Sequence, residues 1–587
     1  MINFKEDEKL EVLNHSCAHL MAQAVKHLYP EAKFWVGPVV EEGFYYDIDL
    51  GDKTITEEDL PLIEKEMKKC SKDAKNIIRK EVTKEEALEQ FKNDEYKLDL
   101  INNMEDGSVI TTYTQGDYTD LCRGPHMSNT KEVKYFKLIK YSGAYWKGDK
   151  NNKVLQRIYG VCFPSEEELN AYIKEMEEAK ERDHRKIGKD LGIFMMSELV
   201  GRGLPMYLPN GFLLWNQFET YIRNKELARD YLHVQTPPLG NVNLYKTSGH
   251  LAHYKDAMFP IMQVEDEEYV LRPMNCPHHM VIYGSEIHSY KDLPIRIAEI
   301  ARDCRYETAG SLKGIERVRT FCQNDSHIFC RPDQIEQEFK GVVDLILECY
   351  KELGLDNFRF ELSLRDPEDK VKYYDDDEMW NNAENKLRDV LNDLGIDYVE
   401  KIGEAAFYGP KLDVQLKPAV GNEFTLSTCQ LDFCLPMRFD LSYIDQDGSK
   451  KTPVVIHRAV FGSIDRFIAT YLEETRGYLP VWCAPKQIEV IPVSSEYHLD
   501  YSKEVYEALK KEGFRVKLDD RNEKLGYKLR EHVMQKIPYM LILGQKEVDN
   551  KEVSFRRAGS EETITMSLDE FIKLVHEDIT SMKRYDK

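Results

Sequence analysis

The chain has 587 residues, of which 42% are hydrophobic, and its formal net charge is −23. At about 150 residues per domain, this length predicts several domains, roughly four. The negative balance argues against a protein coated by nucleic acid, although a local basic surface would suffice to bind one. No apolar run reaches the roughly 20 residues of a membrane-spanning helix, and no signal peptide opens the chain. Twelve cysteines without framework spacing then indicate reduced thiols in a cytoplasmic protein.

The first segment, residues 1–164, mixes helical and strand patterns. Its opening helix places His15 and His19 one turn apart on the same face. Cys122 and His126 have the same spacing around a Gly-Pro turn much further along. These four side chains could form a metal site, but the glutamate of the HExxH motif of zinc proteases is absent, so a metalloprotease is not favoured.

Residues 165–186 predict a single helix. Ser165 and Glu168 have the capping-box spacing, and charged residues cover all but one stripe. The stripe is too short for a coiled coil, which favours a linker helix packed on a neighbouring domain. It consists of Leu169, Tyr172, Ile173 and Met176.

The middle of the chain contains a predicted hairpin rich in arginine. Apolar alternation at 296–300 and 318–321 indicates two paired strands joined by a glycine-bearing loop. Several guanidinium groups on one sheet face favour a polyphosphate ligand, because each is always charged and forks onto phosphate oxygens. Ion pairing between Arg305 and Glu307 is the competing interpretation. The charged residues expected on the strands are Arg305, Glu307, Arg317 and Arg319.

Three residues around this hairpin have the chemistry of zinc ligands. Cys276 precedes the hairpin, His327 follows it, and His457 comes much later in the sequence. One thiolate and two imidazoles would leave the fourth position of a zinc ion open. Any long chain contains buried Cys and His, so these residues alone indicate little.

The surrounding motifs resemble a known family. RYE, RVRTF and a glycine-bearing helix ending in Arg466 resemble motifs 2 and 3 of class II aminoacyl-tRNA synthetases. RPMNCP, SHIF and VIHR resemble the zinc-ligand segments of the threonyl-tRNA synthetase family. HVQTPPL resembles motif 1, with Pro237 as its proline, and implies a homodimer. The resemblance extends over almost the whole chain and implies a multidomain α+β protein. Its parts would be an α+β editing domain at 1–164, the linker helix, an antiparallel-sheet catalytic domain at 187–478 and an α/β anticodon-binding domain at 479–587.

The implied reaction joins threonine to ATP and transfers it from the adenylate to the terminal adenosine of tRNA-Thr. Adenylate formation needs charge neutralisation and in-line geometry more than a protein base. By resemblance, Arg305 would hold the α-phosphate, and Arg317 and Arg466 the distal phosphates. Mg²⁺ would bridge the phosphates of ATP. Glu307 would accept from the adenine amino group, and Phe321 would stack on the ring.

One zinc ion per chain, bound by Cys276, His327 and His457, would act as a selector. Its open position would take the amino group and β-hydroxyl of threonine, so valine would be rejected. Serine lacks only a methyl group, worth roughly 1–3 kcal/mol, which is too little for translation. A separate editing site is therefore expected. By resemblance and position, the same catalytic cleft would contain His250 as a proton acceptor, Asp325, Tyr408, Lys411 and Gln430.

The first segment resembles the editing domain shared by threonyl- and alanyl-tRNA synthetases. The similarity covers FWVGPVVEEGFYYDIDL, EYKLDL, YTDLCRGPH and SGAYWKGDKNNKVLQRIYG. It implies a metal-free pocket that hydrolyses mischarged seryl-tRNA. The residues carried over are His15, His19, Tyr46, Lys97, Asp120, Cys122 and His126.

From residue 479 onward, strand and helix patterns alternate, which predicts a mostly parallel sheet covered by helices, the last capped at Ser567. Six basic residues cluster there: Arg515, Lys517, Arg521, Lys524, Lys528 and Arg530. A solvated charged helix would explain them equally well. Similarity to the anticodon-binding domain of this synthetase group instead implies tRNA contacts by Asn522, Arg530, Glu547 and Arg556.

Most bacterial members of the family carry a small ubiquitin-like domain before the editing domain, whereas this chain begins almost at His15, so we expect that domain to be lacking. Two other classes remain as alternatives. A regulatory or RNA-binding paralogue would usually lose motif arginines, but Arg305, Arg317 and Arg466 are present. A zinc hydrolase centred on the opening helix would leave the second half of the chain unexplained.

Overall fold

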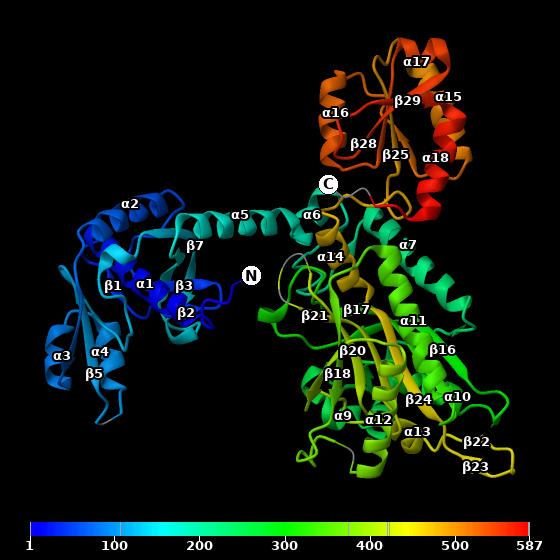
Figure 1. The fold of residues 1–587 in the computed structure, drawn as a ribbon, viewed down its shortest axis with the longest axis horizontal. Helices are drawn as coiled ribbons and strands as arrows, with labels where there is room; N and C mark the ends of the chain where they lie inside the picture. The colour runs from blue at the N-terminus through cyan, green and yellow to red at the C-terminus, as the bar shows by residue number, and fades with distance from the viewer. Residues whose placement is uncertain (1, 106, 374, 419–420, 422, 585–587) are drawn as a thin grey trace. The chain divides into compact units, whose positions relative to one another are not determined.

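The computed structural model describes residues 2–105, 107–373, 375–418, 421 and 423–584. The chain divides into two compact units, Met1–Glu178 and Ala179–Lys587 (Figure 1). Each unit has its own buried apolar core. None of the helices in the described part of the chain is both long and apolar enough to cross a membrane.

The first unit is built around a sheet of strand order β1-β3-β8-β7, in which β2 also pairs with β3. Helix α1 (Glu8–Leu28) begins at Asp7, whose side chain accepts from the amides of Lys9 and Leu10. Asn14 fixes the helix to β8: Nδ2 donates to the Cys162 carbonyl at 2.9 Å, and Oδ1 accepts from the Cys162 amide at 2.8 Å. This contact sets the rotation of α1. The strands are β1 (Lys33–Phe34), β2 (Val39–Val40), β3 (Gly43–Asp49), β7 (Tyr135–Tyr145) and β8 (Val154–Phe163).

A smaller sheet of β4 (Ile77–Val82), β5 (Ile110–Gln115) and β6 (Tyr118–Leu121) completes this unit. Its helices are α2 (Asp59–Lys72), α3 (Lys84–Gln90) and α4 (Glu95–Asn102). Helix α5 (Glu166–Arg182) follows β8, and the Ser165 hydroxyl accepts from the Glu168 amide at 3.2 Å, as the capping pattern predicts. Leu169 and Tyr172 of α5 are buried in the core of the first unit.

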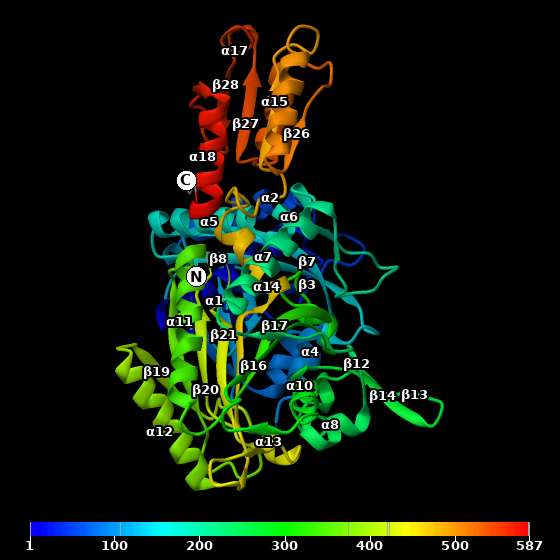
Figure 2. The same cartoon turned by 90° about the vertical axis from the view of Figure 1, so that its right-hand side faces the viewer.

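The second unit contains a sheet of strand order β11-β16-β17-β24-β21-β20-β18-β19. Its neighbours pair antiparallel except β11 with β16 and β18 with β19, which confirms the antiparallel sheet expected for a class II core. Helix α11 (Ile335–Leu353) packs against β17, β24 and β21 (Figure 2). The strands are β11 (Leu232–His233), β16 (Ile295–Cys304), β17 (Thr320–Cys330), β18 (Phe358–Leu364), β19 (Tyr398–Ile402), β20 (Lys411–Leu416), β21 (Phe424–Asp432) and β24 (Val454–Ser463).

Aromatic packing joins α7 (Pro209–Leu227) to α14 (Ile464–Glu474) and the sheet. Phe218 of α7 meets Phe467 and Tyr471 of α14 edge to face, with ring centroids 5.0 and 5.2 Å apart. The shorter elements of this region are α6 (His184–Asp190), β9 (Phe194–Met195), β10 (Met206–Tyr207), β12 (Leu239–Asn241), α8 (Val242–Ser248), α9 (His250–His253), β13 (Met262–Val264), β14 (Glu267–Leu271), α10 (Cys276–Tyr283), β15 (His288–Ser289), α12 (Asp377–Asp393), α13 (Cys434–Arg438), β22 (Tyr443–Ile444) and β23 (Lys450–Lys451).

The arginine-rich hairpin differs from its prediction in one respect. Cys304 and Thr320 form the last pair between β16 and β17, so the four charged residues placed on the strands lie in the connecting loop instead. Loops present side chains without the alternation of a pleated strand, which frees several guanidinium groups to converge. Arg466 also differs, because it lies in the first turn of α14 and not at the end of a helix.

The last part of the chain forms a sheet of order β26-β25-β27-β28-β29. Strands β26 (Val516–Leu518), β25 (Ile488–Pro492) and β27 (Tyr539–Leu543) are parallel, as predicted. Strands β28 (Glu552–Arg557) and β29 (Ile564–Ser567) add an antiparallel hairpin on β27, because their short connection cannot cross over the sheet. The helices are α15 (Leu499–Lys511), α16 (Leu525–Met534), α17 (Gln545–Asn550) and α18 (Leu568–Ser581).

Candidate functional site

The three predicted zinc ligands come together in the second unit. Cys276 is the first residue of α10, while His327 of β17 and His457 of β24 are direct partners in the sheet register. All three side chains are buried, and one ligand atom from each lies within 4.8 Å of the others. Strand pairing thus places two imidazoles side by side although 130 residues of sequence separate them.

Hydrogen bonds orient both imidazoles. His327 Nδ1 lies 2.7 Å from His279 Nδ1, and His279 Nε2 lies 3.2 Å from Glu299 Oε2. If His279 donates to the carboxylate, it accepts from His327, which leaves His327 Nε2 as a lone pair. That nitrogen is buried and has no hydrogen-bond partner. His457 Nε2 is 2.8 Å from Asp432 Oδ2, which leaves Nδ1 of His457 free.

This donor set fits a zinc ion. A thiol, two imidazoles and carboxylates behind the imidazole chains are the usual composition of such a site. Burial lowers the pKa of His327 well below its ordinary value, and neighbouring His457 and His279 add to that effect. The imidazole is therefore neutral, the form that binds a metal. Burial also raises the pKa of the Cys276 thiol, and a bound cation would favour the thiolate instead.

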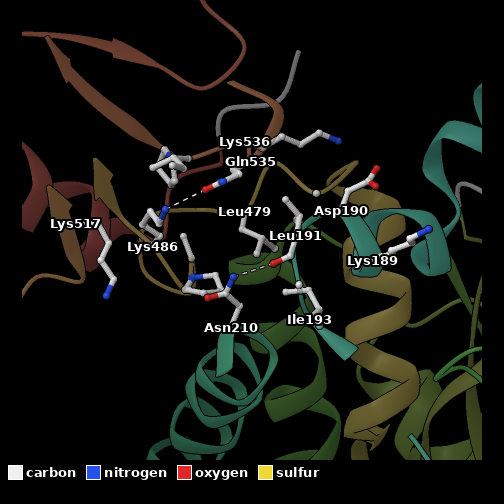
Figure 3. Close-up of a pocket in the computed structure, with 16 residues that line it drawn as sticks. Lys189, Asp190, Leu191, Ile193, Asn210, Leu479, Lys486, Lys517, Gln535 and Lys536 are labelled. Carbon is white, nitrogen blue, oxygen red and sulfur yellow. Dashed lines mark hydrogen bonds between the residues drawn. The ribbon is translucent and has the colours of Figure 1, made fainter. Parts of the chain in front are cut away.

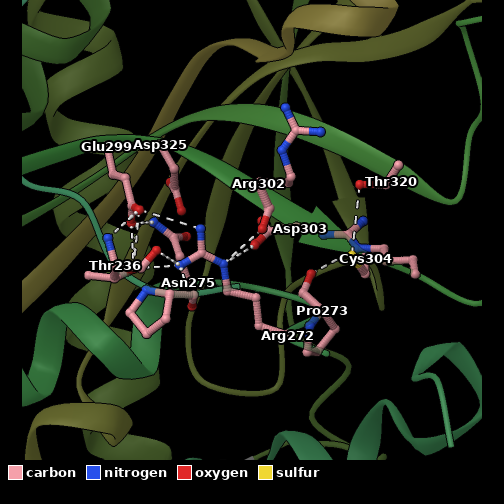
Figure 4. A network of polar contacts seen from close by, with 12 residues as sticks. Thr236, Arg272, Pro273, Asn275, Glu299, Arg302, Asp303, Cys304, Thr320 and Asp325 are labelled. Atoms are coloured by element: carbon pink, nitrogen blue, oxygen red, sulfur yellow. Dashed lines mark hydrogen bonds and ion pairs between the residues drawn. The ribbon is translucent and has the colours of Figure 1, made fainter. Parts of the chain in front are cut away.

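Through His279 and Glu299, the predicted zinc ligand His327 is connected to a buried ionic network (Figure 4). Arg272, 1% exposed, pairs through Nε with Asp303 at 3.0 Å and through Nη2 with Glu299 at 3.4 Å. Burial favours the protonated form of Glu299, but hydrogen bonding from His279 and the charge of Arg272 prevail and lower its pKa to about 2. At Asp303 burial dominates and raises the pKa to about 7.

None of the residues in this supporting network is among the predicted site residues. Its members are His279, Glu299, Arg272, Asp303 and Asp432. The only signal was the presence of charged residues inside otherwise apolar segments, such as the glutamate of IRIAEIA. A buried charge needs a partner, so such a residue indicates an interior ion pair, but the partner is decided by the tertiary structure.

The remaining cleft residues surround the metal-ligating group. Tyr408 stacks on His457 with ring centroids 5.2 Å apart and donates to Gln430 Oε1 at 2.6 Å. Lys411 Nζ pairs with Asp413 at 2.6 Å in the same sheet. Asp325 Oδ2 is 3.9 Å from His327 Nε2, the partnerless nitrogen.

His250 lies on the other side of the group. Its Nε2 is 3.6 Å from the Cys276 thiol, and its Nδ1 is 2.7 Å from the Ser248 hydroxyl. Burial, followed by the nearby His457, lowers the pKa of His250 to about 3. The ring is neutral at pH 7 and can accept a proton, although only weakly.

The predicted phosphate-binding arginines come together from two elements: Arg305 and Arg317 lie in the loop between β16 and β17, and Arg466 lies in the first turn of α14. Arg305 and Arg317 both depress the pKa of Arg466, in addition to the larger effect of burial, so the three charges are close together. The Arg305 guanidinium lies 5.0 Å from the Phe321 ring centroid. Glu307 pairs with Arg317 at 3.0 Å, and not with Arg305 as the competing interpretation supposed. Arg466 Nε donates to the Glu316 carbonyl at 3.0 Å.

The first unit brings together its own four predicted residues. Cys122 Sγ lies 3.2 Å from His15 Nε2 and 3.3 Å from His126 Nε2. His15 Nδ1 is 3.2 Å from the Pro125 carbonyl, and His126 Nδ1 is 3.2 Å from the Ser16 hydroxyl. His19 completes the group, and all four ligand-type atoms lie within 4.8 Å of one another.

A buried carboxylate supports this cluster. Asp120 pairs with Lys97 at 2.6 Å, accepts a hydrogen bond from Tyr46 and lies 3.6 Å from His19 Nε2. A cavity of about 830 Å³ opens beside these groups, lined among others by His15, His19 and Lys97. Burial lowers the pKa of His19 well below its ordinary value, so the ring is a neutral base.

The residues predicted to contact an anticodon lie on several elements of the last sheet domain. Asn522 and Arg530 are exposed, on the loop before α16 and on α16 itself. Glu547 has structural contacts: it accepts from the Gly544 amide at 2.8 Å and from the Ser554 hydroxyl at 2.6 Å. Arg556 Nε donates to Thr563 Oγ1 at 3.0 Å.

The six basic residues nearby do not form one surface. Arg515 donates to the carbonyls of Ala484 and Trp482, and Lys528, 1% exposed, donates to the Asp519 carbonyl. Arg521 pairs with Asp519 and Glu531. These three residues therefore have partners within the domain, whereas Lys517, Lys524 and Arg530 are exposed members of the set.

A second polar cavity, of about 470 Å³, lies in the second unit (Figure 3). Lys486 Nζ donates to Gln535 at 3.0 Å, and Asn210 donates to the Leu191 carbonyl at 2.8 Å. Ammonium groups on a concave surface suit an anionic ligand. The lysines that line it are Lys189, Lys486, Lys517 and Lys536.

Comparison with known protein families assigns a class to this architecture. Residues 259–475 match the tRNA synthetase class II core domain (G, H, P, S and T), residues 487–578 an anticodon binding domain, and residues 110–159 the threonyl and alanyl tRNA synthetase second additional domain. The antiparallel sheet, with its buried group of candidate metal ligands and its arginine loop, is thus the core of a class II aminoacyl-tRNA synthetase.

Individual relatives define the family. The threonine–tRNA ligase of Geobacillus sp. (strain WCH70) is 56% identical over 574 residues, covering 97% of this chain and 89% of the relative. That of Staphylococcus carnosus (strain TM300) is 56% identical over 579 residues. The crystal structure of the RNA binding domain of threonyl-tRNA synthetase from Cryptosporidium parvum Iowa II is 38% identical, with a TM-score of 0.64, and covers 67% of this chain and 98% of that one. The chain belongs to the threonine–tRNA ligase family, whose substrates are threonine, ATP and tRNA-Thr.

Proposed function

We propose that Cys276, His327 and His457 hold one zinc ion that selects threonine in the first step of the ligase reaction. The partnerless, buried Nε2 of His327 beside a thiol and a second imidazole is the observation that carries this proposal. Zn²⁺ bound there would supply an open position for the amino group and β-hydroxyl of threonine. Asp325, Tyr408 and Gln430 would complete the threonine pocket.

The arginines would neutralise the negative charge of the ATP phosphates. Arg305 would hold the α-phosphate of Mg²⁺-ATP, and Arg317 and Arg466 the distal phosphates, where fixed positive charge stabilises the transition state. Their closeness, seen in the effect of Arg305 and Arg317 on the pKa of Arg466, supports this assignment. Lys411 would add a cation to the cleft. Glu307 would release Arg317 when adenine binds, and Phe321 would stack on the base.

The transfer step needs a proton acceptor, and His250 is proposed for it. Its neutral imidazole is oriented by Ser248. A pKa of about 3 makes it a weak base, so it would act by orienting and accepting a proton only as positive charge develops on the attacking hydroxyl.

The first unit is proposed to hydrolyse seryl-tRNA without a metal. His15, His19, Cys122 and His126 would surround the ester, with a neutral imidazole activating water. The ion pair of Lys97 with Asp120 would orient His19 and the substrate amine. The cavity beside them has room for a terminal nucleotide that carries serine.

The same proposal covers the tRNA contacts, the homodimer, the domain boundaries and the cellular location. Asn522, Arg530, Glu547 and Arg556 would contact the anticodon, and the lysine-lined cavity would face tRNA phosphates. Leu232, directly before the segment that resembles motif 1, and Leu239, its last residue, are 59% and 38% exposed, which supports a homodimer. The four regions 1–164, 165–186, 187–478 and 479–587 would be the functional parts. The twelve free thiols support a cytoplasmic location.

A threonine-dependent ATP–pyrophosphate exchange assay tests the catalytic proposal, together with zinc analysis. Exchange should require threonine, and Cys276→Ser should contain about one zinc fewer per chain than wild type and lose exchange. Cys429→Ser, which changes a buried thiol outside the metal-ligating group, is the matched control. Full zinc retention by Cys276→Ser would place the zinc elsewhere and defeat the assignment.

A further inference from the structure

A third group of ligand-type side chains lies in the first unit, away from the sites described above. His27 comes from the last turn of α1, and Glu66 and Cys70 from α2. Glu66 and Cys70 are four residues apart, so they share one face of the helix. One ligand atom from each of the three residues lies within 4.8 Å of the others.

The separations match tetrahedral coordination. His27 Nδ1 lies 3.1 Å from Glu66 Oε1 and 3.7 Å from Cys70 Sγ. Zinc bonds of about 2.0–2.1 Å to nitrogen or oxygen and about 2.3 Å to sulfur place neighbouring tetrahedral ligands roughly 3.3–3.6 Å apart. For these two pairs, entry of a cation needs shifts of a few tenths of an ångström, and Glu66 and Cys70 have ligand atoms within 4.8 Å of each other.

A fourth side chain fixes the imidazole. Asp117, in the turn between β5 and β6, is 3.0 Å from His27 Nε2, and Gln23 Nε2 donates to the same carboxylate at 2.9 Å. A carboxylate on Nε2 holds a proton there, so loss of the second ring proton would leave the Nδ1 lone pair directed toward Glu66 and Cys70. Carboxylate–histidine–metal arrangements of this kind are the usual support of a metal-ligating imidazole.

We propose that His27, Glu66 and Cys70 form a second metal site, of the chemistry preferred by Zn²⁺, with Asp117 as the supporting carboxylate. Thiolate, imidazole and carboxylate together select a borderline transition cation over Mg²⁺ or Ca²⁺. Binding releases the thiol proton of Cys70 and the proton between His27 Nδ1 and Glu66. The side chains of His27 and Glu66 are 31% and 15% exposed, so solvent water fills the fourth position.

The site would join α1 to α2. Helix α1 also carries His15 and His19, so a metal at its end would restrain the element that presents the proposed editing imidazoles. The alternative is a purely electrostatic cluster, in which a protonated His27 bridges Glu66 and Asp117 while Lys69 pairs with Glu66 at 2.5 Å. The two alternatives differ in whether the cluster holds a metal.

The test uses the full chain in a Cys122→Ser, Cys276→Ser background, which removes the thiols of the other two groups. The protein is stripped with a chelator, loaded with Zn²⁺ alone, and analysed for bound zinc by equilibrium dialysis. One zinc per chain is expected, and adding His27→Ala or Cys70→Ser should weaken its binding at least tenfold. His576→Ala, which changes an exposed histidine of α18, is the matched control and should bind zinc like the background.

Cobalt provides a second readout that does not depend on affinity. Co²⁺ bound at the site should show a thiolate-to-metal charge-transfer band that disappears in Cys70→Ser and remains in His576→Ala. Circular dichroism of each variant establishes that it is folded. Zinc binding by the background chain that is unchanged in both His27→Ala and Cys70→Ser, or the absence of zinc from the folded background chain, would overturn the proposal.

Discussion

Single residues in the catalytic unit show how buried charge is kept in place. Arg272, Glu299 and Asp303 are all at most 3% exposed, and each has a charged partner. An unpaired charge in that position would cost several kcal/mol. Removal of one member of the network would therefore leave a buried charge without its partner and destabilise the folded state. Because His279 links Glu299 to His327, the same network orients a proposed zinc ligand.

Glu299→Gln should make stability less dependent on acid pH. The folded-state pKa of Glu299 is about 2, below its ordinary value of 4.5, so its stabilisation is complete above pH 4.5 and is lost as pH falls toward 2. The shift corresponds to about 3 kcal/mol. The Tm gap between wild type and variant should therefore be largest near neutral pH and narrow below pH 4.5. A gap that widens on acidification would contradict the assigned direction of the shift.

Arg305→Ala and Arg466→Ala should each lower threonine-dependent pyrophosphate exchange by at least 100-fold. Each removes a fixed positive charge from the place where phosphate charge develops. Zinc content and Tm should stay near wild type, since neither side chain ligates the metal. Arg319→Ala, from the same loop, is the control and should retain more activity. Near-normal exchange in either main variant would refute the phosphate assignment.

Secondary-structure elements decide which of these residues can meet. Adjacent pairing of β17 with β24 brings His327 opposite His457, and a register slip of one residue would turn one of them to the other face of the sheet. In the first unit, α1 presents His15 and His19 because Asn14 fixes its rotation against β8. Strand register and helix rotation therefore decide which residues far apart in the sequence come together. For residues close in the sequence, their spacing decides this.

His15→Ala combined with His19→Ala should abolish hydrolysis of preformed seryl-tRNA while threonylation remains intact. The substitutions remove both imidazoles from the proposed editing cavity and change no residue of the second unit. Lys9→Gln, at an exposed position of the same helix, is the control and should keep editing. Wild-type protein that fails to deacylate seryl-tRNA would remove the basis for the editing proposal.

Ser567→Ala should destabilise the last domain by about 1 kcal/mol through the loss of the cap of α18. The Ser567 hydroxyl accepts from the Glu570 amide, and Glu570 accepts from the Ser567 amide at 3.0 Å. Glu577→Ala, in the exposed middle of the same helix, should change stability far less. Urea unfolding followed by circular dichroism measures both. Equal effects of the two substitutions would mean that the cap contributes nothing.

At the scale of the whole molecule, the chain separates amino-acid activation from tRNA recognition. The arginine loop and the metal-ligating group lie in the sheet of β16, β17 and β24, whereas the proposed anticodon residues belong to a different sheet. The two steps of the reaction can therefore be disturbed independently.

Asn522→Ala with Arg530→Ala should reduce aminoacylation of tRNA-Thr about tenfold or more and leave pyrophosphate exchange unchanged. Both side chains are exposed and free to contact a nucleic acid, and charge-based contacts should weaken further as salt rises. Lys583→Ala, on the exposed end of the chain, serves as the comparison. Normal charging by the double variant would show that the anticodon is read elsewhere.

The sequence by itself determined the family, the antiparallel catalytic sheet and the residues with ligand chemistry. Motifs are local, so Cys276, His327 and Arg305 could be recognised from their immediate neighbours. Alternation and capping signals likewise predicted the helix after Ser165 and the last helix after Ser567, because backbone preferences act over a few residues.

Only the tertiary structure decided which side chains meet. Glu307 pairs with Arg317 because the loop between β16 and β17 folds back on itself. The pairing of Cys304 with Thr320 at the two ends of the loop brings these side chains together. The proposed zinc ligand His327 is supported by residues from separate elements, namely His279, Glu299 and Arg272. The spacing of these residues in the sequence does not predict their contacts. The cluster of His27 with Glu66 and Cys70 arises in the same way, from two helices whose packing is fixed by the apolar residues around it and not by the ligands themselves.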